Sequence, residues 1–191
     1  MNRNHLINFL RSLALTTTLA SCATYNPQTE NASISEVETW DSVSISLSRS
    51  LCFGACPSYF VEIEGDGTVN YCGRNFVKEI GKREDSLPQT DVQTLFNRFK
   101  EADFEALDDK YKAPVTDLPT YTLRLAYDDT VKTVIDYGGE MIDMPAVVTK
   151  LQQAVDETAT TKKWVGDFSQ RRRTDNSAEC DAAFEPHKSV P

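Results

Sequence analysis

The chain has 191 residues, 40% of them hydrophobic and 26% charged, and a formal net charge of −9 at pH 7. This length and apolar content suit one domain with one core, and nothing in the composition indicates a second domain. The negative charge disfavours binding to nucleic acid and disfavours a flat contact with anionic lipid. We therefore expect no nucleic-acid partner, and we interpret the charge as a solubilising surface.

The first 21 residues have the pattern of a secretory signal. Arg3 and Arg11 make the start basic, and a short, mostly apolar run follows that is too brief to span a bilayer. The run ends in Leu19-Ala20-Ser21-Cys22, which resembles the bacterial lipobox. That resemblance implies a signal peptide over residues 1–21 and acylation of Cys22. Because Ala23 rather than an aspartate follows, it also implies an outer-membrane lipid anchor facing the periplasm.

The segment after the lipobox is rich in Ser, Thr, Asn and Glu and has few large apolar residues. Such a composition cannot bury enough apolar surface to offset the entropy lost on ordering. Residues 22–42 are therefore predicted to be a flexible tether between the lipid anchor and a folded domain.

Alternation of apolar and polar residues predicts the strands. It begins at Val43 and continues to Ser48, which indicates a strand with one face in water. Residues 59–64 and the residues from Val69 onward alternate on either side of Gly65-Asp66-Gly67, so they predict a β-hairpin. Residues 75–83 alternate less regularly and predict a fourth strand.

The second half of the chain predicts two helices around another hairpin. Apolar residues recur at helical spacing in both helices, and at every second position in the first strand of this hairpin. The positions are Val92, Leu95, Phe96 and Phe99; then Tyr121, Leu123 and Leu125, with Val131, Val134 and Ile135 in the return strand; then Val148, Leu151 and Val155, after Pro145.

The element order β-β-β-β-α-β-β-α, with hairpin connections, predicts an α+β fold. We expect a two-layer sandwich in which an antiparallel sheet of about six strands carries two helices on one face. This domain is predicted over residues 43–165. Residues 166–191 turn polar and charged and lose their periodicity, so we expect an extended or disordered tail.

The stretch Cys52-Phe53-Gly54-Ala55-Cys56-Pro57-Ser58-Tyr59, followed by the Gly65-Asp66-Gly67 turn, is the most specific motif in the chain. It resembles the CFGxCPxY motif of a bacterial domain of unknown function that occurs on envelope proteins. The resemblance covers roughly residues 43–165. It implies no activity, substrate, cofactor or catalytic residue, and it does not include Cys72 or Cys180.

Four cysteines remain once Cys22 is lipidated, and in an oxidising compartment they favour disulfides. Four cysteines allow three pairings. We favour Cys52–Cys56 as a short ring that fixes the shape of the loop, and Cys72–Cys180 as a long-range bond that fastens the tail to the sheet.

Other chemistries have less support in the sequence. A thiol–disulfide or copper-handling role for Cys52 and Cys56 is the main alternative, although a strand, not a helix, follows the motif. Structural zinc on the four cysteines lacks the usual paired spacing. His5 and His187 are the chain's histidines, so the predicted domain has none to act as base for a serine or cysteine nucleophile. Asp66 and Asp117 are typical turn formers, with cation binding as a minor alternative.

The sequence therefore predicts a lipid-anchored envelope protein whose domain is a non-catalytic binding or structural module. No cofactor or metal site is predicted, and the ligand or partner is not identified by any motif.

Overall fold

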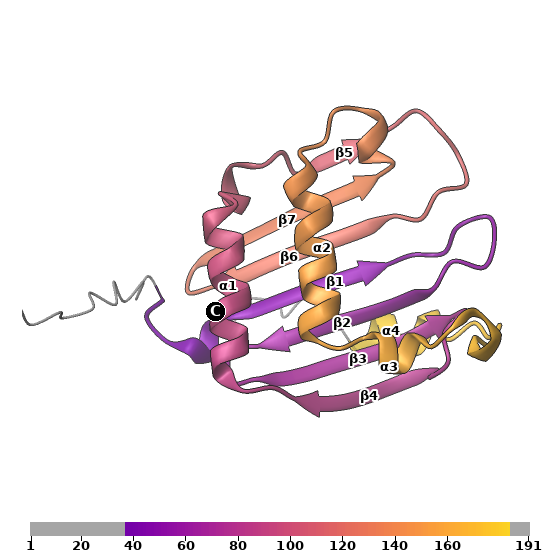
Figure 1. Ribbon diagram of the computed structural model, residues 1–191, viewed down its shortest axis with the longest axis horizontal. Helices are drawn as coiled ribbons and strands as arrows, with labels where there is room; N and C mark the ends of the chain where they lie inside the picture. The colour runs from indigo at the N-terminus through magenta and orange to yellow at the C-terminus, as the bar shows by residue number, and fades with distance from the viewer. Residues whose placement is uncertain (1–36, 184–191) are drawn as a thin grey trace, which may run out of the picture. The chain divides into compact units, whose positions relative to one another are not determined.

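The computed structural model describes residues 37–183. One seven-stranded sheet, in the order β4-β3-β2-β1-β6-β7-β5, forms the centre of the fold. Two long helices, α1 (Gln89–Glu101) and α2 (Ala146–Thr158), cover one face of it (Figure 1). The strands are β1 (Ser44–Arg49), β2 (Ser58–Glu64), β3 (Thr68–Asn75), β4 (Gly81–Ser86), β5 (Lys110–Lys112), β6 (Tyr121–Tyr127) and β7 (Thr130–Tyr137).

The sheet is antiparallel except at one edge. The central strand β1 pairs with β2 on one side and with β6 on the other, so two hairpins, β2–β3 and β6–β7, extend the sheet in opposite directions. The short strand β5 pairs in parallel with β7. At the other edge, five of the six residues of β4 are exposed and four are charged, which protects an edge strand from pairing with another chain.

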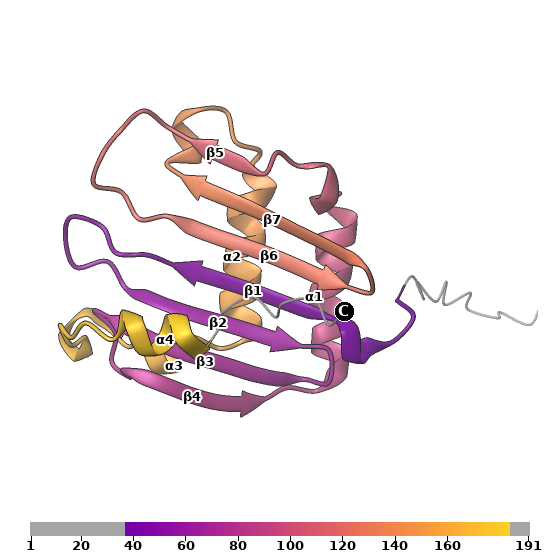
Figure 2. The same cartoon turned by 180° about the vertical axis from the view of Figure 1, so that it is seen from behind.

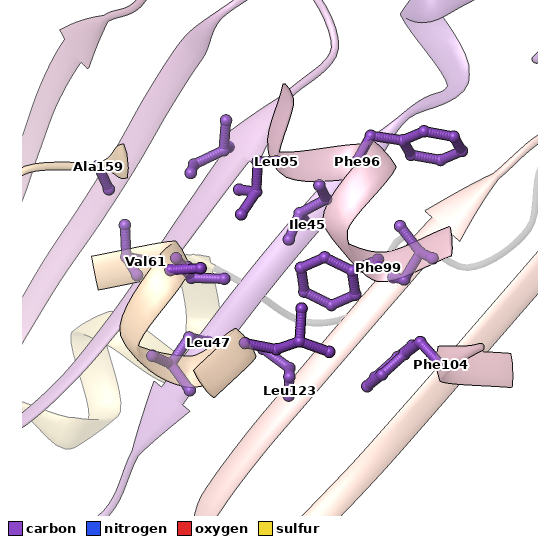
Figure 3. Packing of buried hydrophobic residues seen from close by; sticks show 14 of the residues in the cluster. Ile45, Leu47, Val61, Leu95, Phe96, Phe99, Phe104, Leu123 and Ala159 are labelled. Carbon is purple, nitrogen blue, oxygen red and sulfur yellow. The ribbon is translucent and has the colours of Figure 1, made fainter. Parts of the chain in front are cut away.

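The hydrophobic core lies between the sheet and the two long helices. Every second residue of the central strands points into it, including Ile45, Leu47, Val61 and Leu123, which are fully buried. Figure 3 shows these residues against Leu95 and the three phenylalanines Phe96, Phe99 and Phe104. The rings of Phe99 and Phe104 meet edge to face at 4.9 Å between centroids. The predicted periodicity of both helices and of the central strands thus matches the buried face.

The segment after α2 passes from one face of the sheet to the other. Helix α3 (Lys162–Val165) lies on the core side, where Trp164 stacks on Tyr71 with 4.8 Å between ring centroids. The chain then makes a single β-bridge from Arg172 to Val77. Helix α4 (Ser177–Ala183) lies on the opposite face, where it contacts β3 and β4 (Figure 2).

Two details of the predicted sheet are wrong. The strand predicted over residues 75–83 is β4 at Gly81–Ser86, because Phe76 and Gly81 have positive φ angles that break an extended backbone between them. The sheet has seven strands rather than six, and it is not purely antiparallel. The additional strand is β5, whose three residues are too few to produce an alternation, and whose pairing with β7 joins distant parts of the chain.

Both predicted flanking segments also differ from the structure within the described residues. The end of the predicted tether is packed on the domain: the ring of Trp40 meets Phe96 edge to face at 5.6 Å, and Ser42 Oγ donates to Asp128 Oδ1 at 2.9 Å. The predicted disordered tail contains α4 and the bridge at Arg172. Tertiary contacts order the described parts of these segments, residues 37–42 and 166–183, although their local sequence has no clear periodicity.

The predicted signal peptide and Cys22 lie outside the described residues. Within residues 37–183, none of the helices has the length and hydropathy needed to cross a membrane.

Candidate binding site at the cysteine-loop end of the sheet

The cysteine loop connects β1 to β2 at one end of the sheet. A disulfide joins Cys52 to Cys56, with 5.7 Å between their Cα atoms, which is the local pair favoured by the sequence. Both cysteines are partly exposed. Phe53, between them, is 87% exposed and Leu51 is 39% exposed. The short ring therefore fixes a loop that presents an aromatic side chain to solvent.

A second loop, residues 113–120, lies against the cysteine loop. Ser50 N donates to Thr120 O at 2.9 Å, and Thr120 N donates back to Ser50 Oγ at 2.8 Å. Phe53 N donates to Asp117 O at 3.1 Å. The two loops are thus joined through their backbones, and Asp117, with φ 71°, acts as a turn residue as predicted.

Four polar residues form a row across neighbouring strands at this end of the sheet. Tyr59 on β2 lies opposite Arg49 on β1, Arg49 lies opposite Tyr121 on β6, and Tyr121 lies opposite Asp136 on β7. We call these four residues the polar row. Their positions continue the core-facing alternation of each strand, so the polar row faces α2 where the apolar core ends.

Helix α2 contributes a carboxylate that holds one half of the polar row. Asp156 accepts hydrogen bonds from Arg49 Nη2 at 2.6 Å and Nε at 3.1 Å. Its other oxygen accepts from Tyr59 OH at 2.6 Å and from Thr161 Oγ1 at 2.8 Å. The guanidinium carbon of Arg49 lies 4.5 Å from the centre of the Tyr121 ring. This network fixes the guanidinium in one place.

Burial governs the ionisation of this cluster. Burial raises the pKa of Tyr59 far above its usual value, and the charge of Arg49 offsets only part of that shift. Burial by itself would lower the pKa of Arg49. The electrostatic interactions with Tyr59 and Asp156 and the hydrogen bond that Arg49 donates to Asp156 outweigh burial, so the pKa of Arg49 is raised. At neutral pH the network therefore consists of a neutral phenol and a permanent guanidinium cation.

Asp136, at the other end of the polar row, lies beside the Gly138-Gly139 turn that follows β7. Asp136 Oδ2 accepts from Gln152 Nε2 at 2.9 Å, and Asp136 Oδ1 accepts from Gly139 N at 2.9 Å. A side chain at position 139 would be obstructed, because its Cβ would lie 2.5 Å from Met144 Sδ and 2.9 Å from Asp136 Oδ1. Glycine at this position lets the turn close directly over the buried carboxylate.

A pocket of about 400 Å³ opens above the polar row. Arg49, Tyr121 and Asp136 form one wall, and Thr149, Gln152 and Gln153 of α2 form another. The loops that follow β5 and β7 complete it with Leu118, Pro119, Glu140 and Met141. Its volume lies within the range of about 300–1,000 Å³ typical of small-molecule sites. Apolar and charged groups thus border one opening beside the cysteine loop.

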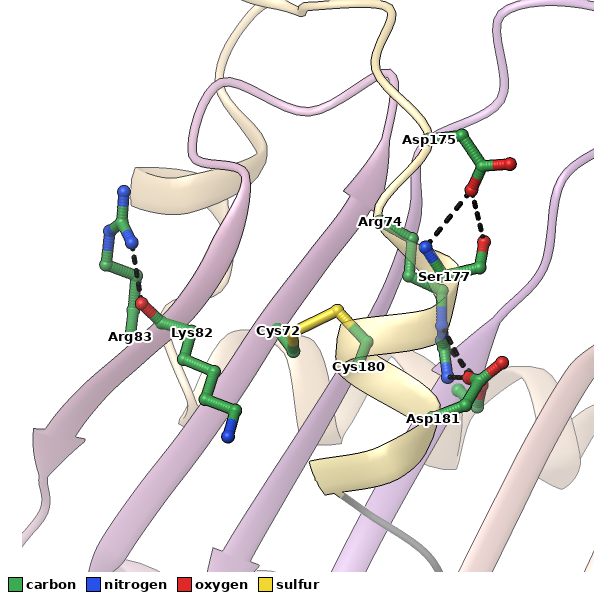
Figure 4. Close-up of a disulfide and its surroundings, with 9 residues drawn as sticks. Cys72, Arg74, Lys82, Arg83, Asp175, Ser177, Cys180 and Asp181 are labelled. Carbon is green, nitrogen blue, oxygen red and sulfur yellow. Dashed lines mark hydrogen bonds and ion pairs between the residues drawn. A yellow bond between two sulfur atoms is a disulfide. The ribbon is translucent and has the colours of Figure 1, made fainter.

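The second disulfide lies on the opposite face of the sheet. Cys72 on β3 is bonded to Cys180 on α4, the long-range pair favoured by the sequence, and both residues are fully buried. An ion pair of 2.8 Å between Arg74 Nη2 and Asp181 Oδ1 lies beside it (Figure 4). This disulfide holds α4 on the sheet and takes no part in the pocket.

A family model described as a domain of unknown function, DUF6438, matches residues 43–159. The chain belongs to this family. The DUF6438 region contains the cysteine loop, the polar row, Asp156 and all of the pocket-lining residues. It ends before α3 and α4, so Cys72 lies inside it and Cys180 outside. No protein in the curated collection matches the chain.

Part of this site in the DUF6438 region could be read from the sequence. The motif points to the cysteine loop, and its tyrosine, Tyr59, holds Asp156. Reasoning from the sequence missed Arg49, Asp136 and Asp156. One signal was available: Arg49 continues the core-facing series Val43, Ile45 and Leu47.

The predicted site residues divide into two groups. Cys52 and Cys56 lie in the loop that is hydrogen-bonded to residues 117 and 120, which flank the pocket-lining Leu118 and Pro119. Cys72 and Cys180 lie on the far face of the sheet. Asp66, in the β2–β3 turn, accepts from Thr68 N at 2.7 Å as a turn former, and this bond lowers the pKa of its carboxyl group. Within residues 37–183, no three His, Cys, Asp or Glu side chains are grouped so as to hold a metal ion.

Proposed function

We propose that this chain is a lipid-anchored protein of the bacterial cell envelope whose DUF6438 domain is a binding module. Support for the anchor comes from the sequence, where Leu19-Ala20-Ser21-Cys22 follows a signal-like run. The residue that follows Cys22 favours the outer membrane, with the domain in the periplasm. Two or more acyl chains on such a cysteine would suffice for stable attachment.

The observation that supports binding is the pocket beside the cysteine loop. Arg49 and Tyr59 are held by Asp156, and Asp136 is held by Gln152 and Gly139. Groups fixed in this way lose little side-chain entropy when a ligand arrives. The disulfide between Cys52 and Cys56 restricts the backbone of the adjacent loop, from which the Phe53 side chain extends into solvent as an aromatic contact.

Metabolic labelling tests the anchor. Cells grown with labelled palmitate are expected to yield a labelled wild-type protein in the membrane fraction. The Cys22→Ser variant should be unlabelled, because the acceptor thiol is removed. An unlabelled, soluble wild-type protein would disprove the anchor without bearing on the pocket.

Photo-crosslinking in intact cells tests the binding module. A photoreactive phenylalanine analogue replaces Phe53 in one variant and Val131 in another. Val131 is 61% exposed and lies at the β6–β7 turn, at the other end of the sheet. We expect a discrete adduct from position 53 and none from position 131. Equal adducts from both positions, or none from position 53, would contradict a role of Phe53 in contacting a partner.

Thiol–disulfide exchange is a second candidate function, which the exposure of the cysteine loop favours. Cys52 and Cys56 are partly exposed, whereas Cys72 and Cys180 are fully buried. In this reaction a dithiol of a partner protein would be oxidised to a disulfide, while Cys52–Cys56 would be reduced to two thiols. Copper handling at the same residues would likewise require the reduced form.

Equilibration in glutathione buffers separates the two candidates. The buried Cys72–Cys180 bond serves as the internal control, and alkylation with mass spectrometry reports each pair. A Cys52–Cys56 potential well below the glutathione range indicates a structural bond and supports the binding module. A potential near that of oxidants such as the periplasmic dithiol oxidases indicates exchange chemistry.

A further inference from the structure

Asp136 is a buried carboxylate without a cationic partner. It is 5% exposed and forms part of the pocket wall. Its two hydrogen-bond donors, the Gln152 amide and Gly139 N, are both neutral. Among the described residues, Asp136 takes part in no ion pair.

Two cationic residues on the same face of the sheet as Asp136 are engaged elsewhere. Arg49, two strands away in the polar row, is paired with Asp156. Lys132, which precedes Asp136 on the same face of β7, pairs with Asp109 at 2.6 Å and also donates to Leu107 O. A carboxylate has about four acceptor sites, and the hydrogen bonds from Gln152 and Gly139 leave about half of them unused. A cationic hydrogen-bond donor strongly stabilises a buried carboxylate whose acceptor sites are only partly occupied.

The rest of the pocket is suited to an apolar group that carries a positive charge. Glu140 adds a second carboxylate at the rim, where it is exposed. Leu118 and Met141, which are 36% and 65% exposed, border the opening together with Pro119 and the Tyr121 ring. Cations are attracted to carboxylates and to the faces of aromatic rings alike.

We propose that the pocket binds a ligand in which a protonated amine is attached to an apolar group. The ammonium donates to Asp136, and the apolar group packs against Leu118, Pro119 and Met141. This inference rests on the proposed binding module, and it specifies the class of ligand that the module recognises.

Titration with phenethylamine, monitored by amide NMR of the oxidised protein, tests the proposal. The signals of the Gly139 amide and the Gln152 side-chain amide should shift with saturation, because both groups bond Asp136. The neutral counterpart of phenethylamine, 2-phenylethanol, should bind more weakly by a factor of about ten or more, because it lacks the charge-assisted hydrogen bond. Equal binding of the two probes, or no shift with either, would overturn the proposal.

Variants at positions 136 and 153 test whether the charge of the pocket, rather than its shape, determines amine binding. Asp136→Asn keeps the size of the side chain and should weaken phenethylamine binding about tenfold or more. Gln153 lines the pocket and is exposed, so its replacement leaves the fold intact. Gln153→Lys should weaken binding and Gln153→Glu should strengthen it. The Gln153 pair keeps the proposal testable if Asp136→Asn does not fold, and equal effects of Lys and Glu would contradict it.

The two proposals fail in distinguishable ways. An adduct at position 53 without amine binding in the pocket would support the binding module and contradict only the proposed class of ligand. Amine binding without an adduct at position 53 would confirm the pocket and remove the role of Phe53. Failure of both experiments would remove the binding module itself.

Discussion

Two buried tyrosines on adjacent strands, Tyr59 and Tyr71, differ in what their hydroxyl groups contact. Their rings lie 5.6 Å apart, and both are almost fully buried. Tyr59 OH donates to Asp156, whereas Tyr71 OH has no hydrogen-bond partner among the described residues. The Tyr59 hydroxyl therefore stabilises the fold through the Arg49 network, and the Tyr71 hydroxyl is desolvated without compensation.

Replacing each tyrosine with phenylalanine should expose this difference. Tyr59→Phe is expected to lower the free energy of unfolding by about 1–2 kcal/mol, because Asp156 loses a donor. Tyr71→Phe should leave it unchanged or raise it. Urea denaturation of both variants checks the prediction, and equal losses would mean that the Tyr71 hydroxyl has a partner.

The same residues predict a loss of stability at alkaline pH. Burial raises the pKa of Tyr59 and of Tyr71 well above the usual tyrosine value of about 10. The unfolded chain releases these protons first, so the stabilisation is complete below about pH 10 and declines as pH rises further. The free energy of unfolding, measured from neutral pH to about pH 11, should fall less steeply in Tyr59→Phe than in the wild type. Parallel curves would contradict the raised pKa of Tyr59.

At the scale of elements, the β2–β3 hairpin depends on its turn. Gly67 has a φ of 97°, and a Cβ there would lie 2.1 Å from Leu87 O. The backbone at Gly67 also accepts a 2.8 Å hydrogen bond from Leu87 N, which directs the chain from β4 into α1. One residue thus sets both the turn and the start of the first long helix.

Gly67→Ala is expected to lower the free energy of unfolding by about 2 kcal/mol or more, because it adds backbone strain and a clash with the backbone. Gly54→Ala is the matched control in the cysteine loop, where a Cβ would meet only Cys52 Sγ, at 3.5 Å. Gly54→Ala should change the free energy of unfolding by no more than about 0.5 kcal/mol. Thermal unfolding followed by circular dichroism distinguishes them, and similar midpoints would show that the turn can relax.

At the scale of the whole molecule, one disulfide restricts a single loop and the other joins α4 to the sheet. The Cys52–Cys56 bond closes a ring over a sequence separation of 4, whereas Cys72–Cys180 spans 108. The longer closure restricts the unfolded chain far more. It also fixes α4 against the face of the sheet that α1 and α2 leave uncovered.

Removing each disulfide should therefore have unequal effects. The chain-entropy model predicts that Cys72→Ala/Cys180→Ala lowers the free energy of unfolding by about 5 kcal/mol. For Cys52→Ala/Cys56→Ala it predicts a decrease of about 2 kcal/mol. Limited proteolysis should cut residues 173–183 only in the first variant. Equal losses of stability, or a protected segment after removal of the long-range bond, would show that packing alone holds α4.

The sequence by itself determined those features that depend on local patterns. Alternation in β1, β2 and β6 and the helical spacing of Val92, Leu95, Phe96 and Phe99 predict a mixed fold with helices on one face, since each pattern reports which side chains are buried. Cysteine chemistry in an oxidising compartment favours the two disulfides that the structure contains. These inferences needed no knowledge of distant contacts.

Only the tertiary structure decided the features that join distant segments. The parallel pairing of β5 with β7 and the packing of Trp40 on Phe96 have no local signal, because their partners lie far away in sequence. The polar row exists only because β1, β6 and β7 are neighbours in this register. Arg49 and Asp136 are ordinary charged residues in the sequence, and the sheet brings them together in one wall of the pocket.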